Sequence, residues 1–195
     1  MKLYDELKRS AILLSEYPGQ WAVCGGIAAS IYRVRPRYTD DIDFAVIDSE
    51  RISAKDLACK IINQLGYKEY LGFVPDSQSP TEQVNGLVCA RDQNNERFKG
   101  FDFLLPNQIW VQEAVMSAQD NFIDYGFASL PTITAENLVF AKLIAINNSP
   151  ERYQDMHDIK EILAEQDIHL ESIKKKITNS KIEFKPEVLK FIERN

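Results

Sequence analysis

Apolar and polar positions follow two different periods in the first third of the chain. Helical spacing and short uninterrupted apolar runs predict the order helix, strand, helix, strand, helix, over residues 2–15, 21–24, 25–33, 44–47 and 53–67. Pro18-Gly19 ends the first helix, Ser53 is a candidate N-cap of the last one, and Gly66 stops it. Strands and helices that alternate in this way are typical of α/β or α+β domains.

The middle of the chain changes to short alternating runs, which are typical of strands. Residues 84–91 and 97–106 flank the polar turn 92–96 and are expected to form a hairpin, whereas residues 71–83 are expected to be a loop. After them come a predicted helix and one predicted short strand, within residues 107–119 and 124–133 respectively.

From Thr134 onward the pattern is helical throughout. A helix over 134–146 begins with Thr134 as a candidate cap and Glu136 in its first turn. The next helix is expected to start at the Ser149-Pro150 signal, and two shorter helices close the chain. We therefore expect two domains, a mixed α/β part over 1–131 and a helical part over 132–195.

Composition and charge limit the classes of function. The chain has 195 residues and a net charge of −6, so a polyanionic partner would have to meet a local basic patch. Three isolated cysteines and two histidines make a zinc site improbable and favour reduced thiols in the core. The N-terminus has no apolar signal core, and no stretch approaches about 18 apolar residues. These features predict a cytoplasmic protein.

Three aspartates stand in four positions, at Asp40, Asp41 and Asp43, directly before an apolar strand. Side chains alternate along a strand, so Asp41 and Asp43 share one face while Ile42 points into the core. A carboxylate pair of this kind suits Mg²⁺, which takes a few carboxylates and leaves positions for substrate phosphates. The alternative is a solvated acidic turn, and that interpretation fits Asp40, which faces away from the pair.

Other residues strengthen the metal interpretation. Gly25-Gly26 stands between a strand and a helix, where backbone amides can approach a phosphate closely, although tight packing explains a glycine pair equally well. Asp102 lies on a later strand and can supply a third carboxylate. Basic residues that could bind phosphate form two groups, for both of which a solvated face is the favoured interpretation: Arg33, Arg35 and Arg37, and Lys174, Lys175, Lys176 and Lys181.

The segment CGGIAASIYRVRPRYTDDIDFAVI, residues 24–47, resembles the nucleotidyltransferase superfamily that includes DNA polymerase β. In the signature of its small bacterial members, Arg37, Thr39, Asp41 and Asp43 match residue by residue. The chain departs from the polymerase-type Gly-Ser, since it has Gly-Gly. The resemblance implies an α+β nucleotidyltransferase fold, with a mixed β-sheet flanked by helices and a C-terminal helical bundle.

A second segment, residues 130–163, resembles the C-terminal region of the AbiEii-like toxin group. There Lys142 corresponds to a lysine that contacts nucleotide phosphates, and Arg152, Asp155 and Asp158 correspond to a second motif. The alternative is that these last three residues, spaced for one helix face, form simple ion pairs. The longer toxins of this group carry further motifs that this chain lacks.

The resemblance implies a chemistry and a set of residues for it. Asp41, Asp43 and Asp102 would bind two Mg²⁺ ions, with Asp102 as general base or base-positioning group. An NMP would pass from an NTP to a hydroxyl acceptor with release of pyrophosphate. The residues expected to bind the NTP are Gly25, Gly26, Arg37, Thr39, Lys142 and Asp155.

Three interpretations of the acceptor remain open. A toxin-like enzyme would modify an RNA end such as that of tRNA, and an antibiotic-type enzyme would modify a small hydroxylated molecule. A third possibility is a non-catalytic partner in a toxin–antitoxin pair that keeps the fold. The net charge argues mildly against a long nucleic-acid footprint, and the intact carboxylates argue against the inactive partner. A cognate antitoxin is a further expected partner.

Overall fold

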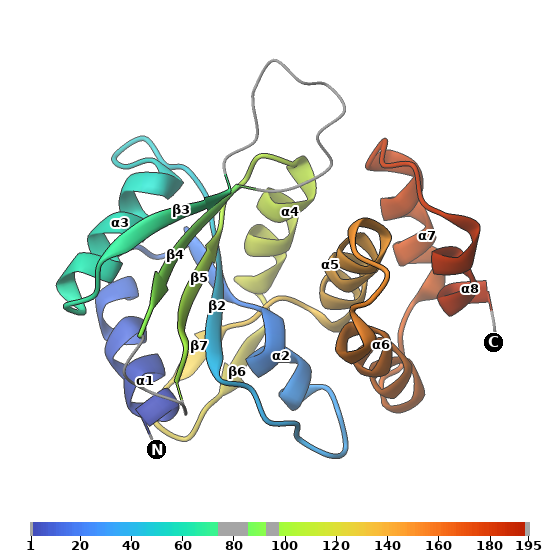
Figure 1. Ribbon diagram of the computed structural model, residues 1–195, viewed down its shortest axis with the longest axis horizontal. Coiled ribbons are helices and arrows are strands. Elements are labelled where there is room, and N and C mark those ends of the chain that lie inside the picture. The colour runs from blue at the N-terminus through green and yellow to red at the C-terminus, as the bar shows by residue number, and fades with distance from the viewer. Residues whose placement is uncertain (1, 74–85, 93–97, 194–195) are drawn as a thin grey trace.

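The computed structural model describes residues 2–73, 86–92 and 98–193 (Figure 1). The elements in chain order are α1 (Lys2–Leu14), β1 (Trp21–Val23), α2 (Gly25–Ile31), β2 (Asp41–Val46), α3 (Ala54–Gln64), β3 (Glu69–Phe73), β4 (Leu87–Arg91), β5 (Gly100–Leu104), α4 (Ile109–Ala118), β6 (Phe122–Asp124), β7 (Ser129–Pro131), α5 (Ala135–Asn148), α6 (Tyr153–Glu165), α7 (Leu170–Asn179) and α8 (Pro186–Glu193). Among the described residues, no helix combines the length and apolar character needed to cross a membrane.

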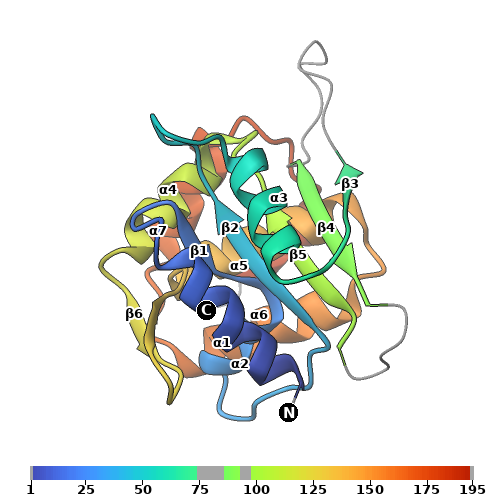
Figure 2. The same ribbon diagram turned by 90° about the vertical axis from the view of Figure 1, so that its left-hand side faces the viewer.

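Five strands form one mixed sheet in the order β1-β2-β5-β4-β3. Strands β2 and β5 are parallel, and the other neighbours are antiparallel. Helices α1 and α3 cover one face, and α2 and α4 lie on the other, with α5 to α8 beyond them (Figures 1 and 2). Strands β6 and β7 form a separate two-stranded sheet. The expected α+β class, with a mixed sheet flanked by helices and a C-terminal helical bundle, is confirmed.

Side chains alternate along β2 and β5, so one face of the sheet is apolar and the other carries the aspartates. Ile42, Phe44, Phe101 and Phe103 are fully buried in the cluster shared with α1 and α3. Ala45 instead belongs to the cluster formed with α2, α4 and the C-terminal helices. Because side chains alternate, the aspartates of β2 and β5 lie on that second face, toward α5.

Several local predictions are confirmed by hydrogen bonds. The Ser53 hydroxyl accepts from the backbone N–H of Asp56 at 3.1 Å, so it caps α3. The Thr134 hydroxyl accepts from the N–H of Asn137 at 3.3 Å and caps α5. Gly66 follows α3 with a φ of +85°, a conformation that favours glycine. The predicted hairpin is the antiparallel pair β4 and β5, and residues 93–96 of its turn lie outside the described residues.

Other boundaries differ from the prediction. Strand β2 starts at Asp41 rather than at 44, because its first residues pair with β5. Residues 124–133 contribute to two strands rather than one, since β6 turns back on β7. Residues 71–73 of the expected loop belong to β3, and residues 74–83 lie outside the described residues. Helix α6 starts at Tyr153 because Ser149, the expected start, still closes α5 through its N–H to the Ala145 carbonyl.

Candidate active site

Three aspartates meet at the junction of the parallel strands β2 and β5. Asp41 and Asp43 are on β2, Asp102 is on β5, and the register places Asp43 directly beside Asp102. Each residue offers a carboxylate oxygen within 4.8 Å of those of the other two. All three side chains are half-buried, and Asp43 and Asp102 line the cavity described below. The acids predicted on two separate strands therefore lie in one group, which we call the acid triad.

The acid triad has an excess of negative charge. Burial, followed by repulsion from Asp41 and Asp102, raises the pKa of Asp43 to about 7. The Gly26 N–H and Lys142 act in the opposite direction but do not cancel this effect. A bound divalent cation would relieve the repulsion, and an all-oxygen donor set is the one that Mg²⁺ prefers. The residues present therefore fit a magnesium site.

The glycine pair at the start of α2 allows this close packing. Gly25 has a φ of +58°, and a Cβ at this position would lie 1.8 Å from Asp43 Oδ2. The Gly26 N–H donates to the same oxygen at 3.2 Å, so this amide orients Asp43. A Cβ on Gly26 would lie 2.4 Å from Thr39 Oγ1. This chain has Gly-Gly where the polymerase-type motif has Gly-Ser, and Thr39 fills the space that a side chain at position 26 would occupy.

The residues that precede β2 are tied to the acid triad and to the C-terminal helices. The Thr39 hydroxyl donates to Asp41 Oδ1 at 2.8 Å and so orients this carboxylate. Arg37 Nε donates to Asp158 Oδ2 at 3.0 Å, and Arg33 Nη1 donates to Asp158 Oδ1 at 2.6 Å. Arg35, by contrast, is exposed.

Asp158, on α6, is fully buried at the centre of a larger ionic group. Lys142 Nζ lies 2.8 Å from Asp158 Oδ2 and 2.5 Å from Asp155 Oδ1. Arg152 Nε also pairs with Asp155, at 2.5 Å, so these residues do form the ion pairs considered above. Burial alone would raise the pKa of Asp155, but Lys142 and Arg152 outweigh it, and the pKa is lowered. We call this set the ion-pair cluster: Arg33, Arg37, Lys142, Arg152, Asp155 and Asp158.

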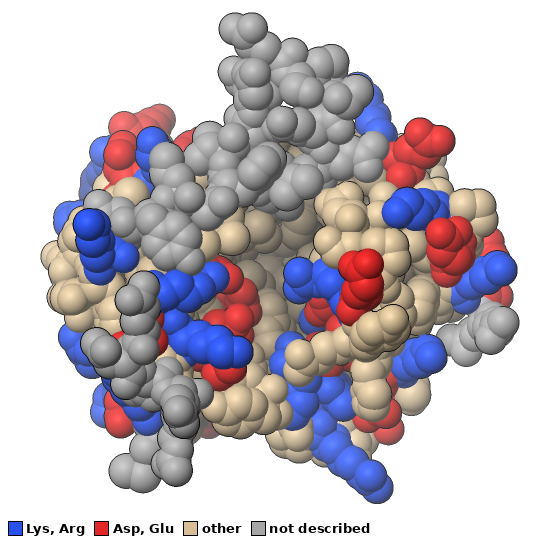
Figure 3. All heavy atoms as spheres, in the orientation of Figure 1, with Lys and Arg blue, Asp and Glu red and all other residues tan. Residues whose placement is uncertain are grey.

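A cavity of about 560 Å³ joins the acid triad to the ion-pair cluster. Gly25, Asp43 and Asp102 line its sheet side, and Lys142, Arg152 and Asp155 line its helix side. Its other walls are mainly apolar and include Leu104, Trp110, Ile133 and Leu138. Figure 3 shows the molecule hollowed between the sheet and the C-terminal helices. Carboxylates and cations that face one apolar cavity can hold a metal-bound polyphosphate and an organic group together.

Two residues of the site were not singled out from the sequence. Arg91, on β4, pairs with Asp102 and so fixes one side of the acid triad. The sequence feature that could have identified Arg91 is its position in the predicted hairpin, on the strand that pairs with the strand of Asp102. Trp110 lines the cavity from α4, and nothing in its local pattern separates it from an ordinary core residue. Asp40 pairs with Lys99 at 2.6 Å and belongs to neither group, as its predicted orientation requires.

Comparison with solved structures finds proteins described as nucleotidyltransferases or as nucleotidyltransferase-like. A nucleotidyltransferase-like antigenic protein from Paracoccidioides brasiliensis superposes with a TM-score of 0.51 and 13% identity, covering 96% of this chain and 91% of its own. A putative nucleotidyltransferase from H. pylori has a TM-score of 0.37 and 10% identity, covering 97% and 86%. The first likeness supports the fold. No curated protein matches the sequence.

The sequence model of one protein family matches most of the chain. This family is described as the nucleotidyl transferase AbiEii toxin of type IV toxin–antitoxin systems, and the match covers residues 7–187. It includes the acid triad, the glycine pair and the ion-pair cluster. The chain belongs to the AbiEii nucleotidyltransferase toxin family.

Proposed function

We propose that this protein is a magnesium-dependent nucleotidyltransferase that transfers an NMP from an NTP to the hydroxyl of an RNA end, such as that of tRNA. The observation that carries the proposal is the meeting of Asp41, Asp43 and Asp102 beside a cavity that Asp43 and Asp102 line and whose opposite wall holds Lys142 and Arg152. Family membership supports nucleotidyl transfer in general. The metal, the catalytic activity and the acceptor are parts of the proposal.

The acid triad is proposed to bind Mg²⁺, with two ions expected. When bound, Mg²⁺ neutralises phosphate charge and lowers the pKa of an attacking hydroxyl. Thr39 and the Gly26 N–H hold the carboxylates of Asp41 and Asp43 in place for this role. Asp102 is proposed to accept or position the proton of the acceptor hydroxyl, and Arg91 orients its carboxylate.

The remaining predicted residues are proposed to bind and position the NTP. Lys142 and Arg152 face the cavity from the helix side, where they can neutralise phosphate oxygens. Asp155 holds both of these cations, and Arg37 secures the segment before β2 through Asp158. Gly25 lines the cavity beside Asp43. The catalytic acids would thus come from a domain over 1–131 and the phosphate-binding lysine from a domain over 132–195.

A small hydroxylated molecule is the second candidate acceptor. The net charge of −6 favours it, because a long nucleic-acid footprint needs many Lys and Arg residues. An antitoxin is a further proposed partner, since the family belongs to type IV toxin–antitoxin systems. NTPs and tRNA share the cytoplasm, where we propose that the protein acts.

The test is a transfer assay with each of the four α-labelled NTPs, Mg²⁺ and total tRNA. A labelled RNA band that is absent with Asp43→Asn is the expected result. Label in a small product, when a cell extract replaces the tRNA, would favour the second candidate. Equal labelling by wild type and Asp43→Asn, or no labelled product under any condition, would overturn the proposal.

A further inference from the structure

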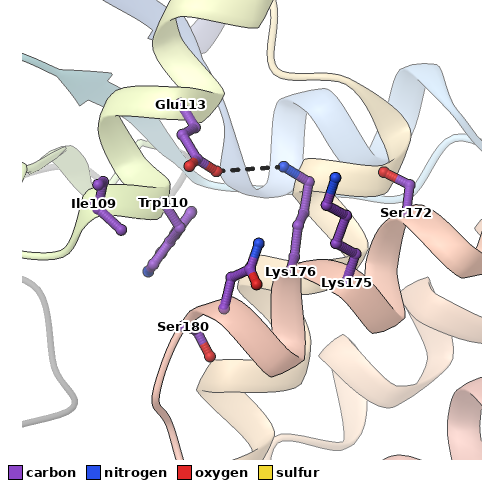
Figure 4. A pocket seen from close by; sticks show the side chains of 8 residues that line it. Ile109, Trp110, Glu113, Ser172, Lys175, Lys176 and Ser180 are labelled. Atoms are coloured by element: carbon purple, nitrogen blue, oxygen red, sulfur yellow. Dashed lines mark ion pairs between the residues drawn. The ribbon is translucent and has the colours of Figure 1, made fainter.

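A second cavity lies between α4 and α7, outside the acid triad and the ion-pair cluster. Its volume is about 300 Å³, and Figure 4 shows its lining side chains. Helix α4 contributes Ile109, Trp110 and Glu113, and α7 with its C-cap contributes Ser172, Lys175, Lys176, Asn179 and Ser180. The wall from α7 therefore consists entirely of cationic and polar side chains.

The charges in this cavity favour an anion. Lys175 and Lys176 extend from α7 toward α4 (Figure 4). Lys176 is largely buried, with 20% of its side chain exposed, and its Nζ is 3.7 Å from Glu113, too far for a hydrogen bond. Lys175 has no ion-pair partner within the described part of the chain. The cavity thus holds two ammonium groups and one carboxylate, which lies near Lys176 alone.

The neighbouring Lys174 provides an internal comparison. It lies on the same helix but pairs with Glu171 at 2.7 Å and does not line the cavity. The run of three lysines therefore does not act as a uniform solvated face. The fold directs two of its charges into a concave site that also holds Ser172 and Asn179 as possible hydrogen-bond donors.

The second cavity adjoins the candidate active site. Trp110 lines both cavities, so the two cavities share a wall residue. Its indole N–H donates to Gln108 at 2.8 Å, and its ring packs edge-on against Phe140 with 5.8 Å between centroids. The wall is consequently fixed in position. A polymeric acceptor extends beyond the first cavity and can reach the neighbouring one, whereas a small acceptor has no such second contact.

We propose that the cavity between α4 and α7 binds a backbone phosphate of the RNA acceptor, through Lys175 and Lys176. The inference rests on the proposed function, because it names the path by which a polymeric acceptor leaves the active site. Lysine, hydroxyl and amide donors are the groups that proteins use to position a nucleic-acid backbone without reading its sequence. A chain of net charge −6 needs such a local site to hold RNA.

Direct binding, with no transfer step, tests the inference. The probe is a fluorescein-labelled RNA stem-loop with a free, single-stranded 3′ end, titrated with the full chain at several salt concentrations. Lys175→Ala/Lys176→Ala should raise Kd about tenfold or more at 0.1 M salt and flatten the log–log salt slope by roughly 0.7 per lysine. Lys174→Ala/Lys55→Ala removes the same charge from outside the cavity and should leave Kd within about twofold. Glu113→Gln, which frees Lys176, should tighten binding.

The outcomes separate this inference from the proposed function. Equal loss of affinity in the two double variants would overturn the phosphate site, even if wild type labels RNA. Lysine-dependent binding by a protein that transfers nothing would keep the site and overturn the proposed function. Tighter, lysine-dependent binding of polyglutamate than of RNA would assign the cavity to an acidic protein partner and overturn the RNA assignment.

Discussion

The acid triad and the ion-pair cluster face the same cavity, and both are built from aspartates, yet their electrostatics are opposite. In the acid triad the carboxylates lie beside one another, and the pKa of Asp43 is raised to about 7. In the ion-pair cluster each aspartate contacts at least two cations of the chain, and the pKa of Asp155 is lowered. Burial acts in the same direction at both residues, so the neighbouring charges decide the difference.

The same fold gives its aspartates two different roles, one in the acid triad and one in the ion-pair cluster. The ion-pair cluster is complete, since Lys142 and the arginines supply the positive charge, and it joins the segment before β2 to α5 and α6. The acid triad keeps a deficit of positive charge that an external cation can fill. Substitutions should therefore act on function at the triad and on stability at Asp158.

The largest expected effect is on catalysis at the acid triad. Asp43→Asn or Asp41→Asn should lower the rate of NMP transfer by about 10³-fold or more, roughly 4 kcal/mol in activation free energy, because an oxygen of the proposed metal site is lost. The fold should persist, with a melting temperature equal to or above that of wild type, since repulsion between carboxylates is removed. Labelled transfer assays and thermal unfolding measure the two effects.

Asp40→Asn is the matched control for this prediction. Asp40 precedes Asp41 directly but pairs with Lys99 at 2.6 Å. Its substitution should change the transfer rate by less than about threefold, as expected for a surface charge. Loss of activity in Asp40→Asn comparable to that in Asp41→Asn would contradict the assignment of roles within this acidic run.

At Asp158 the expected effect is on stability. Asp158→Ala would leave Arg33, Arg37 and Lys142 without their shared buried anion. Removing one partner of a buried ion pair lowers the free energy of unfolding by about 3–5 kcal/mol. Urea unfolding measures this loss, and Glu171→Ala, which breaks an exposed pair with Lys174, should lose less than about 1 kcal/mol. Similar losses of unfolding free energy in the two variants would show that the buried ion pairs of Asp158 contribute no more to stability than an exposed pair.

Gly25→Ala tests whether the acid triad depends on the close approach of α2. The new Cβ would collide with Asp43, and φ is already +58°. We expect a loss of about 1–3 kcal/mol of stability together with a tenfold or greater loss of transfer. Gly66→Ala has a comparable φ of +85° but open space around it, so it isolates backbone strain and should leave the rate unchanged. If Gly66→Ala impairs transfer equally, displacement of Asp43 is not the cause.

Local periodicity predicted the Asp41–Asp43 pair, and the resemblance to nucleotidyltransferases implied that Asp102 joins it. The i, i+2 spacing of Asp41 and Asp43 placed both on one face, and Asp102 lay on a predicted strand, so the three acids needed only the pairing of β2 with β5. The caps Ser53 and Thr134 were equally local, because side chain and acceptor lie within one helical turn. Short-range rules predict such features reliably.

The partners of Asp158 could not be predicted in the same way. Arg33 and Arg37 are separated from it by 125 and 121 positions, and spacing within α6 indicated only that Asp155 and Asp158 share a face. Which cations meet them depends on how α5 and α6 pack on the segment before β2. The same holds for Trp110, which lines two cavities and packs against Phe140 of α5, an arrangement that depends on tertiary packing.

The smallest effect, and the one most specific to the acid triad, is a pH dependence. The pKa of Asp43 is about 7 in the folded protein and near its ordinary value of 3.8 in the unfolded chain. Between these values the folded state binds the extra proton, so stability without metal falls as pH rises from about 4 to 7. Mg²⁺ needs the ionised carboxylate, so its affinity should rise over the same window, by up to about tenfold per pH unit, and level off above pH 7.

Melting temperatures with and without Mg²⁺ from pH 5.5 to 8.5 measure this pH dependence of Mg²⁺ binding, with Asp43→Asn as the variant that should lose it. A Mg²⁺ effect independent of pH in wild type would show that Asp43 is already ionised throughout, and the electrostatic contrast with Asp155 would disappear.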